Sequence, residues 1–82
     1  MKYSVYAVRD KKIGFLQPML DANDQSAMRN FAYGINNSDQ ISNFAPKDFD
    51  LYKIGEFDSD TGKINPIEVL ELICEGESVY NA

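Results

Sequence analysis

The segment spanning residues 46–62 constrains the fold most, because it joins a turn, a strand and a second turn in one short stretch. Residues 46–48 form a turn that begins with proline, and residues 49–57 predict a strand. Residues 58–63, Asp-Ser-Asp-Thr-Gly-Lys, predict a tight acidic turn in which Gly62 is free to adopt a positive φ. The segment therefore predicts a strand with a turn at each end.

The amino-terminal part predicts a β-hairpin. Residues 3–9 are rich in β-formers and are apolar on both faces, which is typical of a strand that is central in its sheet or covered. Residues 10–12 are a polar break, and residues 13–17 predict a second, antiparallel strand. Pro18 ends this pairing because it has no N–H for the ladder.

A single amphipathic helix is predicted to start after Asn23. Asparagine is a favoured N-cap because its side chain accepts an unpaired N–H of the first turn. An apolar stripe follows at helical spacing, formed by Ala27, Met28, Phe31, Ala32 and Ile35. The polar residues 36–39 should end the helix by competing for its backbone hydrogen bonds.

The pattern at residues 66–75 is ambiguous. Residues 65–68, Asn-Pro-Ile-Glu, match a helix start with Asn at the N-cap, and Gly76 matches a helix stop. The same residues would also tolerate a strand. We expect a helix, with a strand as the alternative and a frayed tail over residues 77–82. The chain is thus expected to be one α+β domain over residues 1–82.

Residue counts exclude several kinds of site. The 82 residues include one cysteine and no histidine, so we expect neither an intramolecular disulfide nor a zinc site, and no cofactor. Small domains without such crosslinks often gain stability by self-association, so we expect a homodimer. No leader peptide or membrane span is visible, which predicts action in a reducing cytoplasm.

The net charge of −5 is unevenly distributed. Residues 1–38 carry a balance of +2, and residues 39–82 carry −7. Because sequence-independent DNA binding rests on neutralising phosphates with Lys and Arg, an acidic chain suits it only if folding gathers its few cations. A solvated acidic surface is the simpler interpretation.

No set of residues matches a catalytic motif. Residues 55–63 lack the spacing of a phosphate loop, and a calcium loop counted from Asp58 lacks its closing glutamate. Cys74 lies near Glu71 and Glu75, which should raise the pKa of its thiol and reduce its reactivity. We expect no catalytic residues and no metal site, and therefore not an enzyme.

Two binding hypotheses remain. Aromatic and basic side chains could together stack bases and hold the phosphates of single-stranded DNA; these are Tyr3, Tyr6, Arg9, Lys11, Lys12 and Arg29. In the alternative interpretation the tyrosines belong to the core and the lysines to a hairpin turn. A dimer cleft lined by Arg29, Tyr33 and Tyr52 could hold a small anionic ligand.

Several segments occur in the order found in one phage family. They are Tyr6-Ala-Val-Arg-Asp10, Phe15-Leu-Gln-Pro18, Ala27-Met-Arg-Asn-Phe31, residues 46–58 and Asp60-Thr-Gly62. Over about residues 3–66 the chain resembles the small nonstructural protein of gokushovirus-type microviruses, which are phages with single-stranded DNA genomes.

The resemblance implies a protein of the host bacterial cytoplasm that acts in viral DNA replication or packaging. Its acidic charge favours contact with a basic phage or host replication or packaging protein over direct DNA binding. A single-stranded DNA binder, or a small phage protein that inhibits a host protein or sequesters a ligand, are the alternatives.

Overall fold

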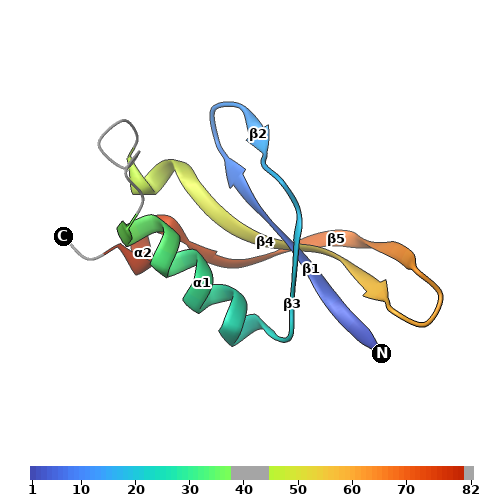
Figure 1. The fold of residues 1–82 in the computed structure, drawn as a ribbon. Helices are drawn as coiled ribbons and strands as arrows, with labels where there is room; N and C mark the ends of the chain where they lie inside the picture. The colour runs from blue at the N-terminus through green and yellow to red at the C-terminus, as the bar shows by residue number, and fades with distance from the viewer. Residues whose placement is uncertain (38–44, 81–82) are drawn as a thin grey trace.

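In the computed structural model, which describes residues 1–37 and 45–80, one antiparallel sheet packs against a helix (Figure 1). In chain order the elements are β1 (Lys2–Asp10), β2 (Gly14–Phe15), β3 (Met19–Asp21), α1 (Asp24–Asn37), the 3-10 turn η2 (Pro46–Asp48), β4 (Phe49–Asp58), β5 (Lys63–Glu75) and α2 (Gly76–Val79). The chain is broadly an α+β protein, as expected.

Strand β1 lies in the middle of the sheet, as its two apolar faces predicted. The strand order is β2-β1-β4-β5, and β3 also pairs with β1. Three successive residues of β1, Val5, Tyr6 and Ala7, are buried. Since successive side chains of a strand point to opposite faces, β1 contributes buried residues to both faces of the sheet.

The predicted amino-terminal hairpin is present, but the strand expected over residues 13–17 covers only Gly14–Phe15, and a further strand, β3, pairs with the same edge of β1. β2 and β3 both pair with β1 in antiparallel register, with Arg9 opposite Phe15 and Val5 opposite Leu20. Pro18 lies between them and interrupts the ladder, because it has no N–H to donate. Pairing then resumes, which the sequence pattern did not predict.

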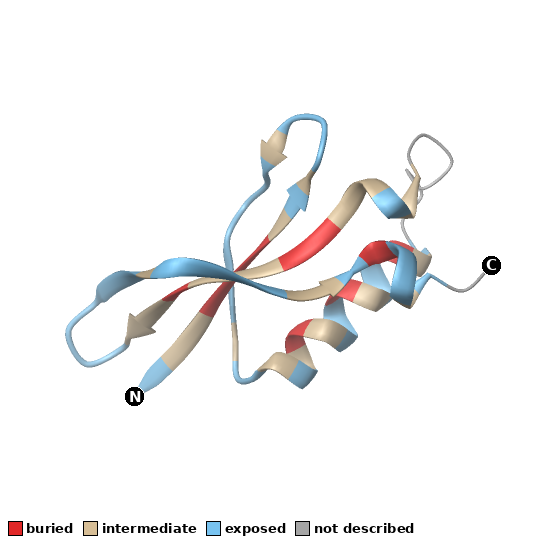
Figure 2. Ribbon diagram, turned by 180° about the vertical axis from the view of Figure 1, so that it is seen from behind, coloured by how far each residue is buried: buried red, intermediate tan, exposed pale blue. Residues whose placement is uncertain are grey.

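Helix α1 has the predicted N-cap and the predicted buried stripe. The Ser26 N–H donates to Asn23 Oδ1 at 2.8 Å, and Ala27, Phe31 and Ile35 are buried. These three residues form the core with Tyr6 of β1 and Leu51 of β4. Figure 2 shows the buried residues gathered on β1, on β4 and on the side of α1 that faces them.

The expected carboxy-terminal helix is wrong, because residues 63–75 form strand β5. β5 pairs with β4 through a turn in which Gly62 has φ +75°, and its register places Ile64 opposite Phe57 and Cys74 opposite Leu51. The helix-start signature is local, whereas a long antiparallel ladder with β4 satisfies the backbone of the whole segment.

The proline of that signature is accommodated by an irregularity in β5. Pro66 lies opposite Gly55, and the next paired residue of β5 is Glu71, opposite Lys53. Residues 67–70 therefore face a single residue of β4, Ile54, in a wide bulge. A proline beside a bulge on the outer strand removes little from the ladder, so the strand continues past it.

The last element of the described residues is helix α2, which includes residues 77–79 of the tail that was expected to be frayed. Val79 packs against the core, and Asn36 Nδ2 of α1 donates to the Val79 carbonyl at 2.9 Å. Gly76 is buried, and a Cβ added there would lie 2.6 Å from the Phe49 carbonyl oxygen and closer still to that of Pro46. Residues 81–82 lie outside the described residues.

Substitution of Gly76 should test this docking of α2. Gly76→Ala forces a methyl group against two backbone carbonyls and should destabilise the fold by roughly 1–3 kcal/mol. Gly34→Ala in α1, where an added Cβ meets nothing within 4 Å, should instead stabilise by about 0.5–1 kcal/mol. Urea unfolding followed by circular dichroism measures both; equal effects of the two changes would contradict the packing of Gly76.

Candidate functional site

Tyr6, one of the proposed DNA-binding residues, belongs to the core. Its side chain is 0% exposed and packs with residues of α1 and β4. Its hydroxyl donates to Asp24 Oδ1 at 2.5 Å, at the start of α1. Burial and this hydrogen bond raise the pKa of Tyr6 to about 12. A ring enclosed in this way cannot stack on a base.

Lys11 and Lys12 hold the β1–β2 turn against the segment that enters β4. Lys11 Nζ lies 3.6 Å from Asp50 Oδ2 and donates to the Lys47 carbonyl at 2.8 Å. Lys12 Nζ lies 3.4 Å from Asp48 Oδ2. Both ammonium groups are therefore paired with carboxylates, which weakens their attraction for phosphate.

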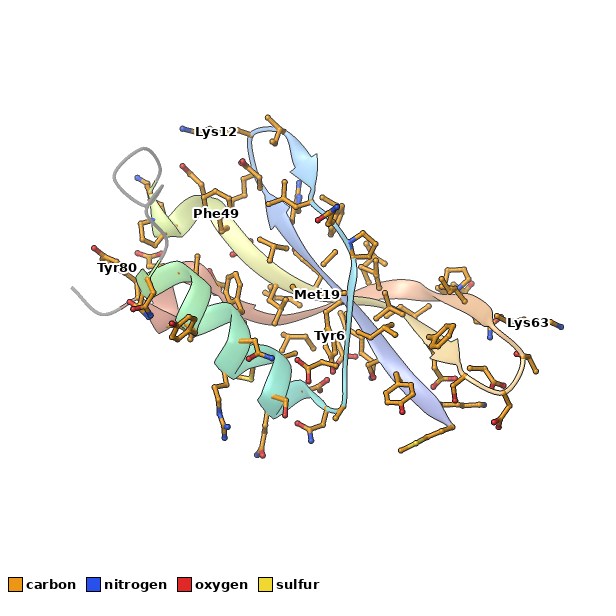
Figure 3. All side chains as sticks on the ribbon, in the orientation of Figure 1. Tyr6, Lys12, Met19, Phe49, Lys63 and Tyr80 are labelled. Atoms are coloured by element: carbon orange, nitrogen blue, oxygen red, sulfur yellow. The ribbon has the colours of Figure 1, made fainter. Side chains whose placement is uncertain are left out.

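The other proposed DNA-binding residues do not lie together. Arg9 is near one end of β1 and Tyr3 near the other, about 20 Å apart at the usual rise of a strand. Arg29 is exposed on α1. Figure 3 shows Lys12 at the tip of the β1–β2 hairpin, away from Tyr6 beneath α1. The described chain thus brings no proposed aromatic residue and cation together in one site.

The proposed ligand residues lie on opposite sides of the sheet. Arg29 and Tyr33 are exposed on α1. The Tyr52 ring makes an edge-to-face contact with Phe15, with centroids 5.6 Å apart, while its neighbour Leu51 packs under α1. Because adjacent strand residues face opposite ways, Tyr52 points away from the helix. One copy of the chain therefore does not assemble this trio.

Cys74 is half-buried and packs against the core. Burial, followed by the charge of Asp50, raises the pKa of its thiol to about 11. The direction of the shift is the one predicted from the sequence, but the cause differs, because the prediction rested on the charges of Glu71 and Glu75. The thiol is protonated at neutral pH, which does not suit a nucleophile.

The structure shows an apolar groove on the sheet face opposite α1, which the sequence analysis did not identify. The groove has a volume of about 390 Å³ and is lined by Val5, Pro18, Met19, Leu20, Ile54, Gly55, Phe57, Ile64 and Pro66. The alternation in β1, whose second apolar face carries Tyr3, Val5 and Ala7, was the available signal. We call the whole side of the sheet opposite α1, which includes this groove, the open face.

A second surface consists of exposed glutamates on β5 and α2. Glu68, Glu71, Glu75 and Glu77 are exposed, and none of them forms an ion pair within the described residues. Among those residues β5 pairs only with β4, so these side chains border the free edge of the sheet. We call the four glutamates the acidic strip.

Neither surface resembles a metal centre. Within residues 1–37 and 45–80, no three His, Cys, Asp or Glu side chains are placed so that they could hold a metal ion. In the same part of the chain, no helix combines the length and apolar character needed to cross a bilayer.

The comparison with protein families gives a match over nearly the whole chain. The family model described as "Phage ORF5 protein" matches residues 3–79. The chain belongs to this phage family. Membership confirms the resemblance to small phage proteins that the sequence segments indicated. No curated protein and no solved structure matches the chain significantly.

The buried hydroxyl of Tyr6 predicts a pH dependence of stability. Folding raises its pKa from 10.0 to about 12, so its contribution is complete below pH 10 and is lost as the pH rises toward 12. Tyr6→Phe should cost about 0.5–1.5 kcal/mol at pH 7, through the lost hydrogen bond to Asp24. The stability difference between wild type and variant should shrink above pH 10.

Urea unfolding from pH 7 to 11.5 measures this difference. The exposed Tyr33 provides a matched control, Tyr33→Phe, which should not alter stability at pH 7. A difference between wild type and Tyr6→Phe that stays constant up to pH 11.5 would contradict the buried position of the hydroxyl.

Proposed function

We propose that this member of the phage family is a non-enzymatic accessory protein that binds a basic protein partner. In this proposal the partner is a phage or host protein of viral single-stranded DNA replication or packaging, and binding takes place in the host bacterial cytoplasm. The family match supports a phage protein. The gokushovirus-type resemblance of the sequence segments supports the more specific role.

The observation that carries the proposal is the unpaired state of the acidic strip. Lys2, Lys11 and Lys12 already form ion pairs with Glu56, Asp50 and Asp48. The glutamates of β5 and α2 have no such partners in the described chain and stay exposed. The electrostatic potential along this edge is therefore negative, which attracts a basic protein surface and repels nucleic acid.

The geometry of β5 suits such a partner. The strand is 13 residues long and carries Glu68, Glu71 and Glu75 beside the exposed apolar residues Val69 and Leu70. Lysines or arginines of a partner could pair with the glutamates while its apolar side chains cover the others. Electrostatic complementarity of this kind sets partner choice and association rate more than it sets affinity.

Reversal of the strip's charge should abolish partner capture. A tagged protein with Glu68, Glu71 and Glu75 all changed to Lys should recover at least tenfold less of its partner from phage-infected cells than wild type. Mass spectrometry of the captured proteins provides the measurement. Asp60→Lys, in the β4–β5 turn, is the control for a charge reversal outside the strip and should capture normally, since Asp60 pairs with the chain's amino terminus.

Two results would contradict the proposal. One is capture that includes no replication or packaging protein of phage or host. The other is salt-sensitive binding of a labelled single-stranded oligonucleotide by the wild-type protein in fluorescence anisotropy, which would favour direct DNA binding instead.

A further inference from the structure

The sheet has one covered face and one open face. α1 and α2 both pack on the side of Tyr6 and Leu51 (Figure 1). Residues directly opposite each other in an antiparallel pair share a face. The register therefore places three apolar rows of side chains on the open face: Tyr3, Phe57 and Ile64; Leu20, Val5, Gly55 and Pro66; and Ala7, Tyr52 and Leu72. A fourth row, next to that of Ala7, carries Phe15 with the charged residues Arg9, Asp50 and Glu75.

One half of the open face is hollow. Gly55 contributes no side chain to the middle row, and the groove of about 390 Å³ lies over it. A Cβ at Gly55 would lie 2.8 Å from the Asn65 carbonyl oxygen, so the close approach of β5 requires glycine here. A dry apolar cavity of about 150 Å³ accepts a benzene molecule, so the groove has room for roughly two apolar side chains of that size.

The other half of the open face is raised. The Phe15 and Tyr52 rings contact each other there, and Leu72 lies across the ladder from Tyr52. Phe15 is 45% exposed and Leu72 is 47% exposed, and exposed apolar side chains grouped in this way are typical of an interaction surface. Val5 belongs to the hollow row and Ala7 to the raised row, and these two residues are two positions apart on β1, so the two halves lie about 7 Å apart.

Charge favours a second copy of the chain as the occupant. No carboxylate or ammonium group lines the groove. By register, Glu56 lies opposite Ser4 and Glu71 opposite Lys53, which places both glutamates on the covered face. The charged groups of the open face are Arg9, Asp50 and Glu75, and Lys11 pairs with Asp50, so the face as a whole carries no net charge. Two chains of net charge −5 can therefore bring their open faces together without net repulsion between those faces. A basic partner would find no excess of carboxylates there.

We propose that two copies pack open face against open face around a two-fold axis. In a two-fold interface each contact occurs twice, so a surface that is raised in one half and hollow in the other complements itself. Phe15 and Leu72, the two exposed side chains of the raised half, enter the groove of the other copy. The sheets would then stack about 10 Å apart, as in other sheet-on-sheet packings.

The oligomeric state of the full chain tests this proposal. Analytical ultracentrifugation from 1 µM to 1 mM should show a dimer. Ile64→Asp in the groove, or Leu72→Asp on the raised half, should raise the dimer dissociation constant at least 100-fold. Ile13→Asp, an identical change at an exposed position in the β1–β2 turn, should leave the dissociation constant unchanged.

Circular dichroism and thermal unfolding confirm that each variant is folded. A wild-type protein that stays monomeric up to 1 mM would overturn the proposal. So would a dimer whose dissociation constant changes no more in Ile64→Asp and Leu72→Asp than in Ile13→Asp, since its interface would lie elsewhere. Neither result depends on partner capture by the acidic strip, so the two proposals fail separately.

A mixing experiment tests the register of the interface. Leu72→Lys and Ile64→Asp should each be monomeric alone. When the two variants are mixed, they should form a one-to-one heterodimer. In it the new lysine of one copy meets the new aspartate in the groove of the other, and at the second, symmetry-related contact both residues, Leu72 and Ile64, are unchanged. Absence of the heterodimer would overturn the pairing of raised half with groove.

Discussion

The burial of Tyr6 and Leu51 beneath α1 is the interaction on which the rest of the structure depends. Both side chains are 0% exposed, and they join the central strand β1 to β4 and to the Ala27, Phe31 and Ile35 stripe of the helix. The Tyr6 hydroxyl also reaches Asp24, so the same residue fixes the start of α1 against the sheet. In so small a domain, few other residues can be withdrawn from water.

This core explains why the molecule has two different surfaces left for binding. One helix covers only one face of the sheet, and the apolar residues of β1 that point the other way remain on the open face. β5, as the outer strand, presents the acidic strip along its free edge. The apolar face suits self-association, and the charged edge suits a basic partner.

Local patterns predicted the elements whose formation depends on near neighbours. Asn23 caps α1 as expected, and Gly62 adopts the positive φ that the turn into β5 needs. Residues 65–68 wrongly predicted a helix start. A helix cap stabilises by only about 1 kcal/mol, and the pairing of the whole strand with β4 contributes more. Strand β3 forms after Pro18 because it can pair with the edge of β1. Those partner residues are too far away in the sequence for a local pattern to predict the pairing.

The candidate sites show the same limit. Tyr3, Tyr6, Arg9 and Arg29 have the chemistry that single-stranded DNA requires, but chemistry alone does not state which side chains share a surface. Tyr6 lies in the core, and Lys11 and Lys12 form ion pairs within the chain. Tyr52 lies on the opposite side of the sheet from Arg29 and Tyr33. The groove over Gly55 depends on residues from β1, β3, β4 and β5, and no single segment of the sequence contains them.

The sequence by itself determined the class of the domain, its phage family and the concentration of acid in its second half. These properties follow from composition and from short motifs. The tertiary structure decided that residues 63–75 are a strand, which cations are already paired, and where the apolar groove lies. Those outcomes depend on strand register, and register is set by contacts between residues far apart in the chain.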